Sequence, residues 1–285
     1  MPVVIDKLNF TYNAKTAFRK EALVDINLCI EDGDYWALIG HTGSGKSTLV
    51  QHLNALIRIQ SGQIRVNDIS LAQKKIDFKR LRADVGMVFQ YPEYQLFAET
   101  VYKDVAFGPH NLKLEKEEID RRVRDAIRRV GLEFGAVAER SPFELSGGEK
   151  RRVAIAGVIA MCPRILILDE PTSGLDPAGK REILSLIKSL KEECSPTILM
   201  INHDMDEVAQ NAGKVALLAD GRLVKTGTPR EVFCDHELLL GLGLDVPTVA
   251  KLRQALIGKG ALIGADVLDE DELVREIIKG YKSKC

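Results

Sequence analysis

The sequence predicts an α/β fold built around a mostly parallel sheet. Strand-like segments alternate along the chain with segments whose apolar residues recur at helical spacing, as in strand–helix–strand units. Ile165–Leu168 and Ile198–Ile201 are continuous apolar runs, as expected for parallel strands that are buried on both faces. A third apolar run, Tyr35–Ile39, ends in a glycine-rich loop, and a helical segment follows this loop.

The first half of the chain is predicted to hold more strands than helices. Partial alternation of apolar and polar residues predicts strands at Val3–Tyr12 and Val24–Ile30. Gln63–Val66 and Val85–Phe89 are further strand candidates. Thr48–Ile57, after the glycine-rich loop, is predicted to be a helix. Residues 91–140 are polar and rich in helical patterns, of which Leu114–Val130 is the clearest.

The second half continues the alternation and then becomes helical. Helices are predicted at Glu149–Met161, Ala178–Glu193 and Met205–Ala212, and the turn Asp220-Gly221 predicts a hairpin of Val215–Ala219 with Arg222–Lys225. From Pro229 onward the pattern predicts short helices, including Pro247–Ile257 and Glu270–Tyr281. The residues expected to face inward from these two helices are Val249, Leu252, Leu256, Leu273, Ile277 and Tyr281.

Composition excludes several classes of protein. Lys and Arg number 40 against 41 Asp and Glu, and this balance argues against a dedicated nucleic-acid-binding protein, which is usually basic. The longest apolar stretch, Val153–Cys162, is far shorter than the ~20 residues of a membrane-spanning helix. No signal peptide is expected at the N-terminus. The five cysteines are scattered and lack CxxC spacing, so we expect reduced thiols in the cytosol.

The glycine-rich loop carries the most specific motif. Gly40–Ser47 reads GHTGSGKS and fits GxxxxGK[ST], between a strand and a helix as this phosphate-binding motif requires. We expect its backbone N–H groups and the helix N-terminus to cradle a polyphosphate. Lys46 is predicted to neutralise the β- and γ-phosphate oxygens, and the Ser47 hydroxyl to bind Mg²⁺. A tight glycine-rich turn would explain the glycines but not the Lys-Ser pair.

Two carboxylates follow directly after the predicted strand Ile165–Leu168. Because the carboxyl ends of parallel strands face the ligand crevice, Asp169 and Glu170 are expected to reach the cradle. Asp169 is predicted to hold Mg²⁺, directly or through water, and Glu170 to polarise or deprotonate the attacking water. Two adjacent acids can also form a solvated turn, but the motif upstream favours the catalytic interpretation.

Gln90 and His203 each follow a neighbouring predicted strand. The Gln90 amide is predicted to bridge Mg²⁺ and water and to sense the γ-phosphate. A lone histidine is more often structural than catalytic. The position of His203 at a strand end, taken with the motifs described next, favours contact with the γ-phosphate.

Leu145-Ser146-Gly147-Gly148-Glu149 and Ser173-Gly174-Leu175-Asp176, with the sites above, resemble the ATP-binding-cassette (ABC) ATPases over about residues 3–229. The resemblance implies a P-loop NTPase of ABC type, with a mixed, mostly parallel sheet and an antiparallel β subdomain. It divides the chain into an ATPase domain (1–228), with a helical subdomain inserted at about 91–163, and a C-terminal helical extension (229–285). In this family the Ser-Gly-Gly motif serves the nucleotide held by a partner subunit, so two subunits enclose two ATP molecules.

The resemblance also assigns roles by position. Tyr12 would stack on adenine, Ser146 and Gly148 would bind the γ-phosphate in trans, and Asp176 would link the two sites across the interface. The expected catalytic residues are Glu170, His203, Gln90 and Lys46, and the expected Mg²⁺ ligands are Ser47, Gln90 and Asp169. The expected nucleotide-binding residues are Tyr12, Gly40, Thr42, Gly43, Ser44, Gly45, Lys46, Ser47, Thr48, Ser146, Gly147, Gly148 and Asp176. One departure is Glu149, where the family usually has Gln.

Longer matches are similar to the ATPases of energy-coupling factor (ECF) transporters, and Gly40-His41-Thr42 specifically suggests the second of the two related ATPases. The longer matches include Phe89–Phe97 (FQYPEYQLF), Asp104–Pro109 (DVAFGP) and Ser141–Gly148 (SPFELSGG). The resemblance implies a peripheral protein at the cytoplasmic face of the membrane, with a second ATPase, a transmembrane coupling subunit and a substrate-capturing membrane subunit as partners. The cargo would be vitamins or transition-metal ions. The segment 91–97, with its three aromatic residues, is predicted to contact the membrane subunit, and core packing is the alternative.

Other functions stay open at this stage. The core motifs also suit another ABC transporter, such as an amino-acid or peptide importer or an exporter, and a soluble ABC ATPase that does not transport. The C-terminal extension is expected either at the interface between ATPases or as a simple packing extension. A binding protein without turnover is disfavoured by Glu170 and His203.

Overall fold

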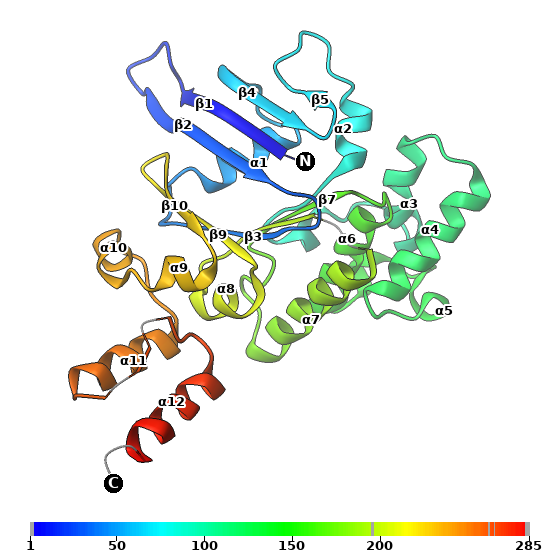
Figure 1. Cartoon of the computed structure of the whole chain (residues 1–285). Helices are drawn as coiled ribbons and strands as arrows, with labels where there is room; N and C mark the ends of the chain where they lie inside the picture. Colours follow the sequence, from blue (N-terminus) through cyan, green and yellow to red (C-terminus); the bar gives the residue numbers. More distant parts are fainter. Residues whose placement is uncertain (1–2, 195–196, 262, 265, 283–285) are drawn as a thin grey trace.

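The computed structural model describes residues 3–194, 197–261, 263–264 and 266–282, and they form two sheets flanked by helices (Figure 1). The smaller sheet is antiparallel and has the strand order β2–β1–β4–β5. Its strands are β1 (Val3–Tyr12), β2 (Lys20–Ile30), β4 (Ser61–Val66) and β5 (Ile69–Ser70). This is the antiparallel β part expected from the sequence.

The larger sheet has the order β10–β9–β3–β8–β7–β6 and is parallel except at β10. Its strands are β3 (Tyr35–Ile39), β6 (Val85–Val88), β7 (Ile165–Asp169), β8 (Thr197–Ile201), β9 (Lys214–Ala219) and β10 (Arg222–Gly227). Four neighbouring parallel strands, β3, β8, β7 and β6, end at the same edge. The segments that follow them therefore emerge side by side, and these are the segments with the predicted catalytic residues.

Helices pack against the sheets and also lie on either side of the larger sheet (Figure 1). The α-helices are α1 (Lys46–Leu53), α2 (Phe78–Asp84), α3 (Val101–Asn111), α4 (Lys116–Arg129), α5 (Phe134–Val137), α6 (Gly147–Ile159), α7 (Pro177–Cys194), α8 (Met205–Asn211), α9 (Pro229–Phe233), α10 (His236–Gly241), α11 (Thr248–Gly258) and α12 (Glu270–Lys282). Two short 3₁₀ turns are η1 (Pro92–Gln95) and η2 (Pro142–Glu144). None of the described helices combines the length and the apolar character needed to cross a bilayer.

The strands of the larger sheet are buried on both faces, and alternate residues enter different cores. On β7, Ile167 packs in the core shared with the antiparallel sheet and α1, whereas Leu168 packs against α6 and α7. On β3, Leu38 joins the first core, whereas Ile39 packs against α8, α9 and α10. This two-sided burial explains the continuous apolar runs in the sequence.

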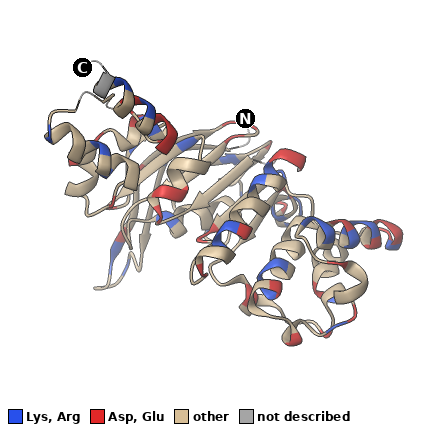
Figure 2. Cartoon of the chain, turned by 90° about the horizontal axis from the view of Figure 1, so that it is seen from below, with Lys and Arg blue, Asp and Glu red and all other residues tan. Residues whose placement is uncertain are grey.

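Helices α3 to α6 gather on one side of the larger sheet (Figure 1). Their contacts with one another, α3 with α4 and α6 and α4 with α6, form a helical layer. Acidic and basic residues alternate along α4, at the right of Figure 2. They form ion pairs three or four residues apart, such as Arg124–Asp120 at 2.7 Å, which support an exposed helix face modestly.

The C-terminal part packs on the sheet through α9 and α10. Phe233 is fully buried beside β3 and β9. Farther along, Val249 and Leu273 are buried as expected, but Leu252 is 51% exposed and Ile277 is 37% exposed. The prediction for these two residues was wrong because α11 and α12 bury only a narrow stripe, through a small cluster of their own. The side chain of Tyr281 lies outside the described residues.

Helix α1 is shorter than predicted. It begins at Lys46 and ends at Leu53 rather than Ile57, because Asn54 caps it and Ala55 takes a positive φ of 54°. The sequence analysis did not predict α2, and it did not give bounds for α3 within the helical region 91–140. Both begin at polar caps, Asp77 and Thr100, whose side chains accept hydrogen bonds from N–H groups of the first turn.

We expect the packing of α9 to stabilise the whole subunit. Phe233→Ala should lower the free energy of unfolding by about 3–5 kcal/mol, because it leaves a cavity against the sheet. Leu240→Ala, at a 61% exposed position on α10, is the matched control and should cost less than about 0.5 kcal/mol. Urea unfolding of the isolated chain measures both values, and equal losses would contradict this account of the core.

Candidate functional site

The phosphate cradle is the loop between β3 and α1. Three of its glycines, Gly40, Gly43 and Gly45, have φ of 152°, 85° and 107°. A Cβ on Gly45 would lie 2.5 Å from the Ala22 carbonyl oxygen, so only glycine lets this loop lie against β2. No side chain caps α1 at Gly45, and the N–H groups of its first turn therefore remain available to an anion.

Polar groups inside the cradle match a polyphosphate. Lys46 is 5% exposed, and its Nζ donates to the carbonyl oxygens of Gly40 at 2.7 Å and His41 at 3.0 Å. Burial lowers the pKa of Lys46, and the charges of Glu170 and Asp169 oppose that shift. The buried Ser44 hydroxyl has no hydrogen-bond partner among the described residues. The third N–H group of the Lys46 ammonium remains for a phosphate oxygen.

The two predicted carboxylates lie at the end of β7. Asp169 is 8% exposed, and burial together with the neighbouring Glu170 raises its pKa, while a hydrogen bond from Ser47 and the charge of Lys46 lower it. Glu170 has a positive φ of 51°. A residue in this left-handed conformation is strained, and such strain is common at functional sites.

Glu170 contacts two of the other three predicted catalytic side chains, Gln90 and His203. Gln90 Nε2 donates to its Oε2 at 2.8 Å, and His203 Nε2 lies 2.7 Å from its Oε1. These three residues follow β6, β7 and β8, so the shared sheet edge brings them together as the sequence predicts. The carboxylate retains lone pairs for a water molecule, since each oxygen accepts only one of these contacts.

The residues predicted to bind Mg²⁺ lie close to the cradle but form a sparse set. The Ser47 hydroxyl is near enough to the Asp169 carboxylate to lower the pKa of that group. The Gln90 amide nitrogen donates to Glu170, which leaves the amide oxygen available as a ligand. Within the described ranges no group of three His, Cys, Asp or Glu side chains is placed to hold a metal. This donor set fits Mg²⁺, which keeps several waters and takes one or two protein carboxylates together with phosphate oxygens.

Tyr12 ends β1 beside the cradle. Its hydroxyl lies 3.1 Å from Thr48 Oγ1, and its ring packs edge-on against Phe10 at 4.8 Å. It is 37% exposed and can present a ring face to a base. The sequence interpretation missed Lys20, a residue of β2 that pairs with Tyr12 of β1. Its Nζ is close to the cradle, 3.9 Å from the position that a Cβ on Gly43 would take. Only the pairing of β1 with β2 reveals this position.

The Ser-Gly-Gly motif starts α6. Ser146 Oγ accepts from Glu149 N at 3.3 Å, and Glu149 Oε2 accepts from Ser146 N at 2.8 Å, which forms a capping box. These hydrogen bonds lower the pKa of Glu149. No hydrogen bond or ion pair in the described part of the chain joins Ser146, Gly147 or Gly148 to the cradle. This chain therefore does not bring its two predicted anion sites together.

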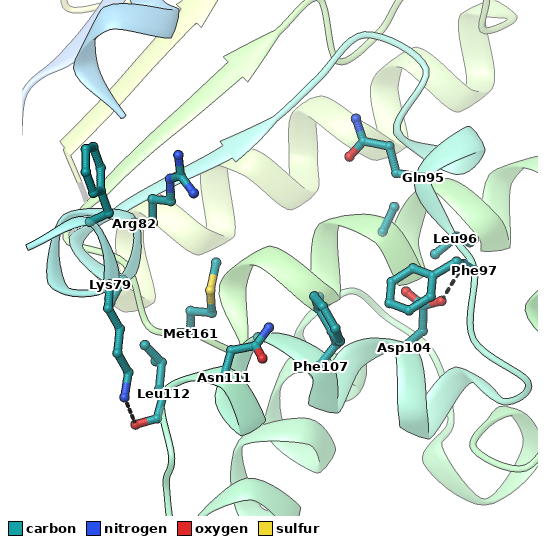
Figure 3. Close-up of a pocket in the computed structure, with 15 residues that line it drawn as sticks. Lys79, Arg82, Gln95, Leu96, Phe97, Asp104, Phe107, Asn111, Leu112 and Met161 are labelled. Atoms are coloured by element: carbon teal, nitrogen blue, oxygen red, sulfur yellow. Dashed lines mark hydrogen bonds between the residues drawn. The ribbon is translucent and has the colours of Figure 1, made fainter. Parts of the chain in front are cut away.

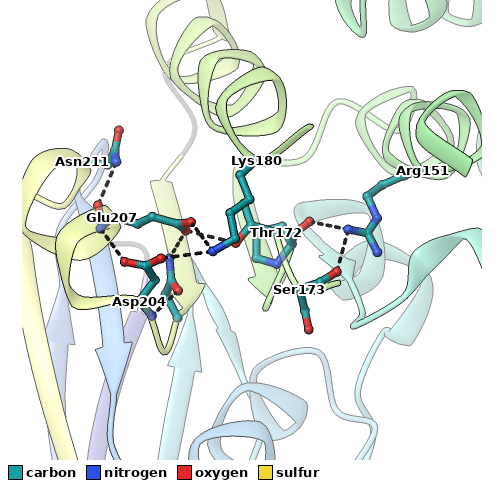
Figure 4. Close-up of polar contacts among 9 residues, drawn as sticks. Arg151, Thr172, Ser173, Lys180, Asp204, Glu207 and Asn211 are labelled. Atoms are coloured by element: carbon teal, nitrogen blue, oxygen red, sulfur yellow. Dashed lines mark hydrogen bonds and ion pairs between the residues drawn. The ribbon is translucent and has the colours of Figure 1, made fainter. Parts of the chain in front are cut away.

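Asp176 caps the start of α7 by accepting from Gly179 N at 2.8 Å. A polar network that the sequence did not indicate ties this region to α8 (Figure 4). Lys180 Nζ lies 3.1 Å from Asp204 and 3.3 Å from Glu207, and the buried Thr172 donates to Glu207 at 3.0 Å. The network holds the loop after Glu170 beside the loop of His203.

The glycine positions in the cradle generate a prediction. Gly45→Ala should lower affinity for a nucleoside triphosphate by roughly tenfold or more, because strain of about 1–3 kcal/mol at this φ would displace the loop N–H groups. Gly135→Ala on α5, where a Cβ meets nothing within 4 Å, should leave binding unchanged. Titration with a fluorescent ATP analogue compares the two variants. Unaltered affinity in Gly45→Ala would argue against this loop as the phosphate site.

Comparison with known proteins agrees with this geometry. Residues 23–173 match the ABC transporter family. The chain is 47% identical to the energy-coupling factor transporter ATP-binding protein EcfA2 of Clostridium tetani, over 100% of this chain and 99% of that protein. It is 49% identical to the protein of the same name from Clostridioides difficile, over 100% and 99%.

Solved structures give the same result. The cbiO1 protein of Clostridium perfringens, described as part of the ABC transporter complex cbiONQ, matches with a TM-score of 0.73 at 39% identity, covering 88% of this chain and 98% of that one. The ATP-binding cassette MJ0796, solved as a dimer bound to ADP and Pi, matches with a TM-score of 0.70 at 28% identity, covering 80% and 98%. The chain therefore belongs to the ABC transporter family, and within it to the energy-coupling factor transporter ATP-binding proteins.

Proposed function

We propose that this chain is the ATP-binding and ATP-hydrolysing subunit of an energy-coupling factor importer. The convergence of Gln90 and His203 on the Glu170 carboxylate, beside a complete phosphate cradle, is the observation that carries the proposal. Full-length similarity to ECF ATP-binding proteins supports the transport role. The division into an ATPase domain (1–228), with its helical subdomain, and an extension (229–285) belongs to the same proposal.

In the proposed reaction, water attacks the γ-phosphorus of ATP and the bond to the bridging oxygen of ADP breaks. Glu170 orients the water and accepts its proton, while His203 and Lys46 contact the γ-phosphate oxygens. Mg²⁺, when held by Ser47, Asp169 and Gln90, supplies positive charge to the β- and γ-phosphate oxygens. Tyr12 stacks on the adenine. Catalysis arises mainly from positioning and charge neutralisation.

The second half of each site is proposed to come from a related or identical ATPase. Ser146, Gly147 and Gly148 are exposed at the start of α6, where helix N–H groups favour an anion. The Ser146 hydroxyl oxygen accepts from Glu149 N, so its O–H remains free to donate to a γ-phosphate oxygen. Closure around ATP and opening after hydrolysis follow from tighter binding of ATP to the closed pair.

The transmembrane coupling subunit is proposed to bind in an apolar groove of this chain (Figure 3). The groove has a volume of about 620 Å³ and lies between α2, α3, α6 and the segment after η1. Phe97 and Phe107 pack edge-on at 4.9 Å, and Asp104 holds the Phe97 and Ala98 N–H groups at 2.9 Å each. An apolar groove of this kind suits a short helix.

A partner in this groove would hold the chain at the cytoplasmic face of the membrane, and the chain is therefore proposed to be a peripheral membrane subunit. A substrate-capturing membrane subunit completes the proposed transporter. Vitamins or transition-metal ions are the proposed cargo class, and that subunit selects among them. Co-purification from membranes, with mass spectrometry, identifies both the partner ATPase and the membrane subunits.

The catalytic assignment predicts the behaviour of Glu170→Gln. Phosphate release should fall by about 100-fold or more, the contribution expected of a general base, while ATP affinity stays near that of the parent chain. Malachite-green turnover assays and binding of a fluorescent ATP analogue separate the two effects. Turnover close to the parent rate would remove Glu170 from its assigned role.

The docking assignment predicts the effect of removing two exposed aromatic rings. Tyr94 is 84% and Phe97 is 60% exposed. The double variant Tyr94→Ala/Phe97→Ala should lower the yield of co-purified membrane subunit by about fivefold or more, the loss expected on truncating anchor residues. Val224→Ala, an exposed position on β10, is the control. A fall in melting temperature with the yield unchanged would instead place the two rings in packing.

A further inference from the structure

Arg151 is a buried cation that the reaction described above does not use. It lies in the second turn of α6, the helix that begins with the Ser-Gly-Gly motif, and only 3% of its side chain is exposed. Burying a guanidinium is costly unless its N–H groups are paired. The hydrogen-bond partners of Arg151 are therefore the contacts that offset the cost of burying its charge.

The first partner is a carboxylate next to the docking groove. Arg151 Nε donates to Glu93 Oε2 at 3.0 Å and Nη2 donates to Glu93 Oε1 at 2.9 Å. This bidentate pair fixes the orientation of the two side chains as well as their distance, and a lysine cannot reproduce it. Glu93 lies in η1, three residues after Gln90, whose amide contacts Glu170.

The second partner is the loop that follows Glu170. Arg151 Nη1 donates to the carbonyl oxygens of Pro171 at 3.2 Å and Ser173 at 2.9 Å (Figure 4). This loop continues to Asp176 at the start of α7. One side chain thus joins the Ser-Gly-Gly helix, the segment at the groove and the loop of the catalytic carboxylate.

Other contacts also link the same loop and segment, and the Gln90–Glu170 hydrogen bond at 2.8 Å is one of them. Gln90 Nε2 is 3.5 Å from Ser173 Oγ, and a Cβ on Gly174 would lie 3.3 Å from the Tyr91 ring. None of these contacts reaches α6. Among the described residues, Arg151 is therefore the one whose hydrogen bonds connect all three segments.

We propose that Arg151 is a positioning residue that makes the Ser-Gly-Gly helix, the segment at the docking groove and the Glu170 loop move as one body. The proposal rests on the proposed function and adds to it the connection between nucleotide site and groove. When the γ-phosphate displaces Gln90 or Glu170, the guanidinium transmits the shift to Glu93 and to α6. Without the pair, the cradle still binds ATP but the groove no longer responds.

Hydrogen–deuterium exchange of the full chain tests this with Mg²⁺ and a non-hydrolysable ATP analogue, AMP-PNP, against ADP. In the parent chain, we expect exchange of residues 91–97 to differ between the two nucleotides by about fivefold, within the range of coupling between linked sites. In Glu93→Gln and in Arg151→Gln, this difference should fall below about twofold. Residues 40–48 should be protected by AMP-PNP in every variant.

Controls separate coupling from folding. Glu182→Gln removes the partner of the adjacent Arg152, which lies 2.6 Å away, and should keep the parent response. Glu93→Gln is close to isosteric, so its melting temperature should stay near the parent value. The variant Glu93→Gln/Arg151→Gln should lose no more response than Arg151→Gln alone, since both changes break one pair.

Three results would overturn the proposal. The first is a fivefold response in 91–97 that persists in Glu93→Gln and Arg151→Gln. The second is a parent chain whose cradle is protected while residues 91–97 do not respond. The third is a loss in Glu182→Gln equal to that in Glu93→Gln. Failure of AMP-PNP to protect residues 40–48 in the parent would instead contradict the proposed function.

Discussion

The parallel pairing of β3, β8, β7 and β6 is the constraint on which the site depends. Val88 pairs with Leu168 and Leu168 with Met200, so the strands are aligned at the edge where they end. The segments with Gly40, Gln90, Glu170 and His203 emerge there within one or two residues of each strand. Because both faces of these strands are buried, a slip of one residue would exchange the residues of two cores. The packing that stabilises the sheet therefore also positions the side chains of the proposed phosphate site.

This constraint explains which parts of the site can be predicted from the sequence. The cradle is one continuous motif, and the carboxylates, Gln90 and His203 follow apolar runs that can be recognised locally. Arg151 and Glu93 are 58 residues apart, and Lys180 and Asp204 are 24 apart, so no local pattern reveals these pairs. The exposure of Leu252 and Ile277 was missed for a related reason. Helical spacing identifies an apolar stripe, but the neighbouring elements determine how much of it they cover.

The loop from Glu170 to Asp176 is held from two sides (Figure 4). On one side, Thr172 donates to Glu207, which pairs with Lys180. On the other side, Arg151 binds the Pro171 and Ser173 carbonyl oxygens. The first set of contacts joins the loop to α7 and α8, and the second joins it to α6 and η1. A loop fixed in this way shifts as a unit, because breaking either buried set leaves charged or polar groups without partners.

Glu149 shows how the start of α6 combines two requirements. A carboxylate at this position stabilises the helix by accepting from Ser146 N, and its lowered pKa reflects that hydrogen bond. The same negative charge offsets part of the positive potential that a helix N-terminus offers to an anion. Because the capping box turns the carboxylate back onto the backbone, the Ser146 O–H and the N–H groups of Gly147 and Gly148 remain to meet a phosphate. In the proposed composite site, recognition by this half then depends on directed hydrogen bonds more than on net charge, and such bonds require the phosphate to lie at the correct distance.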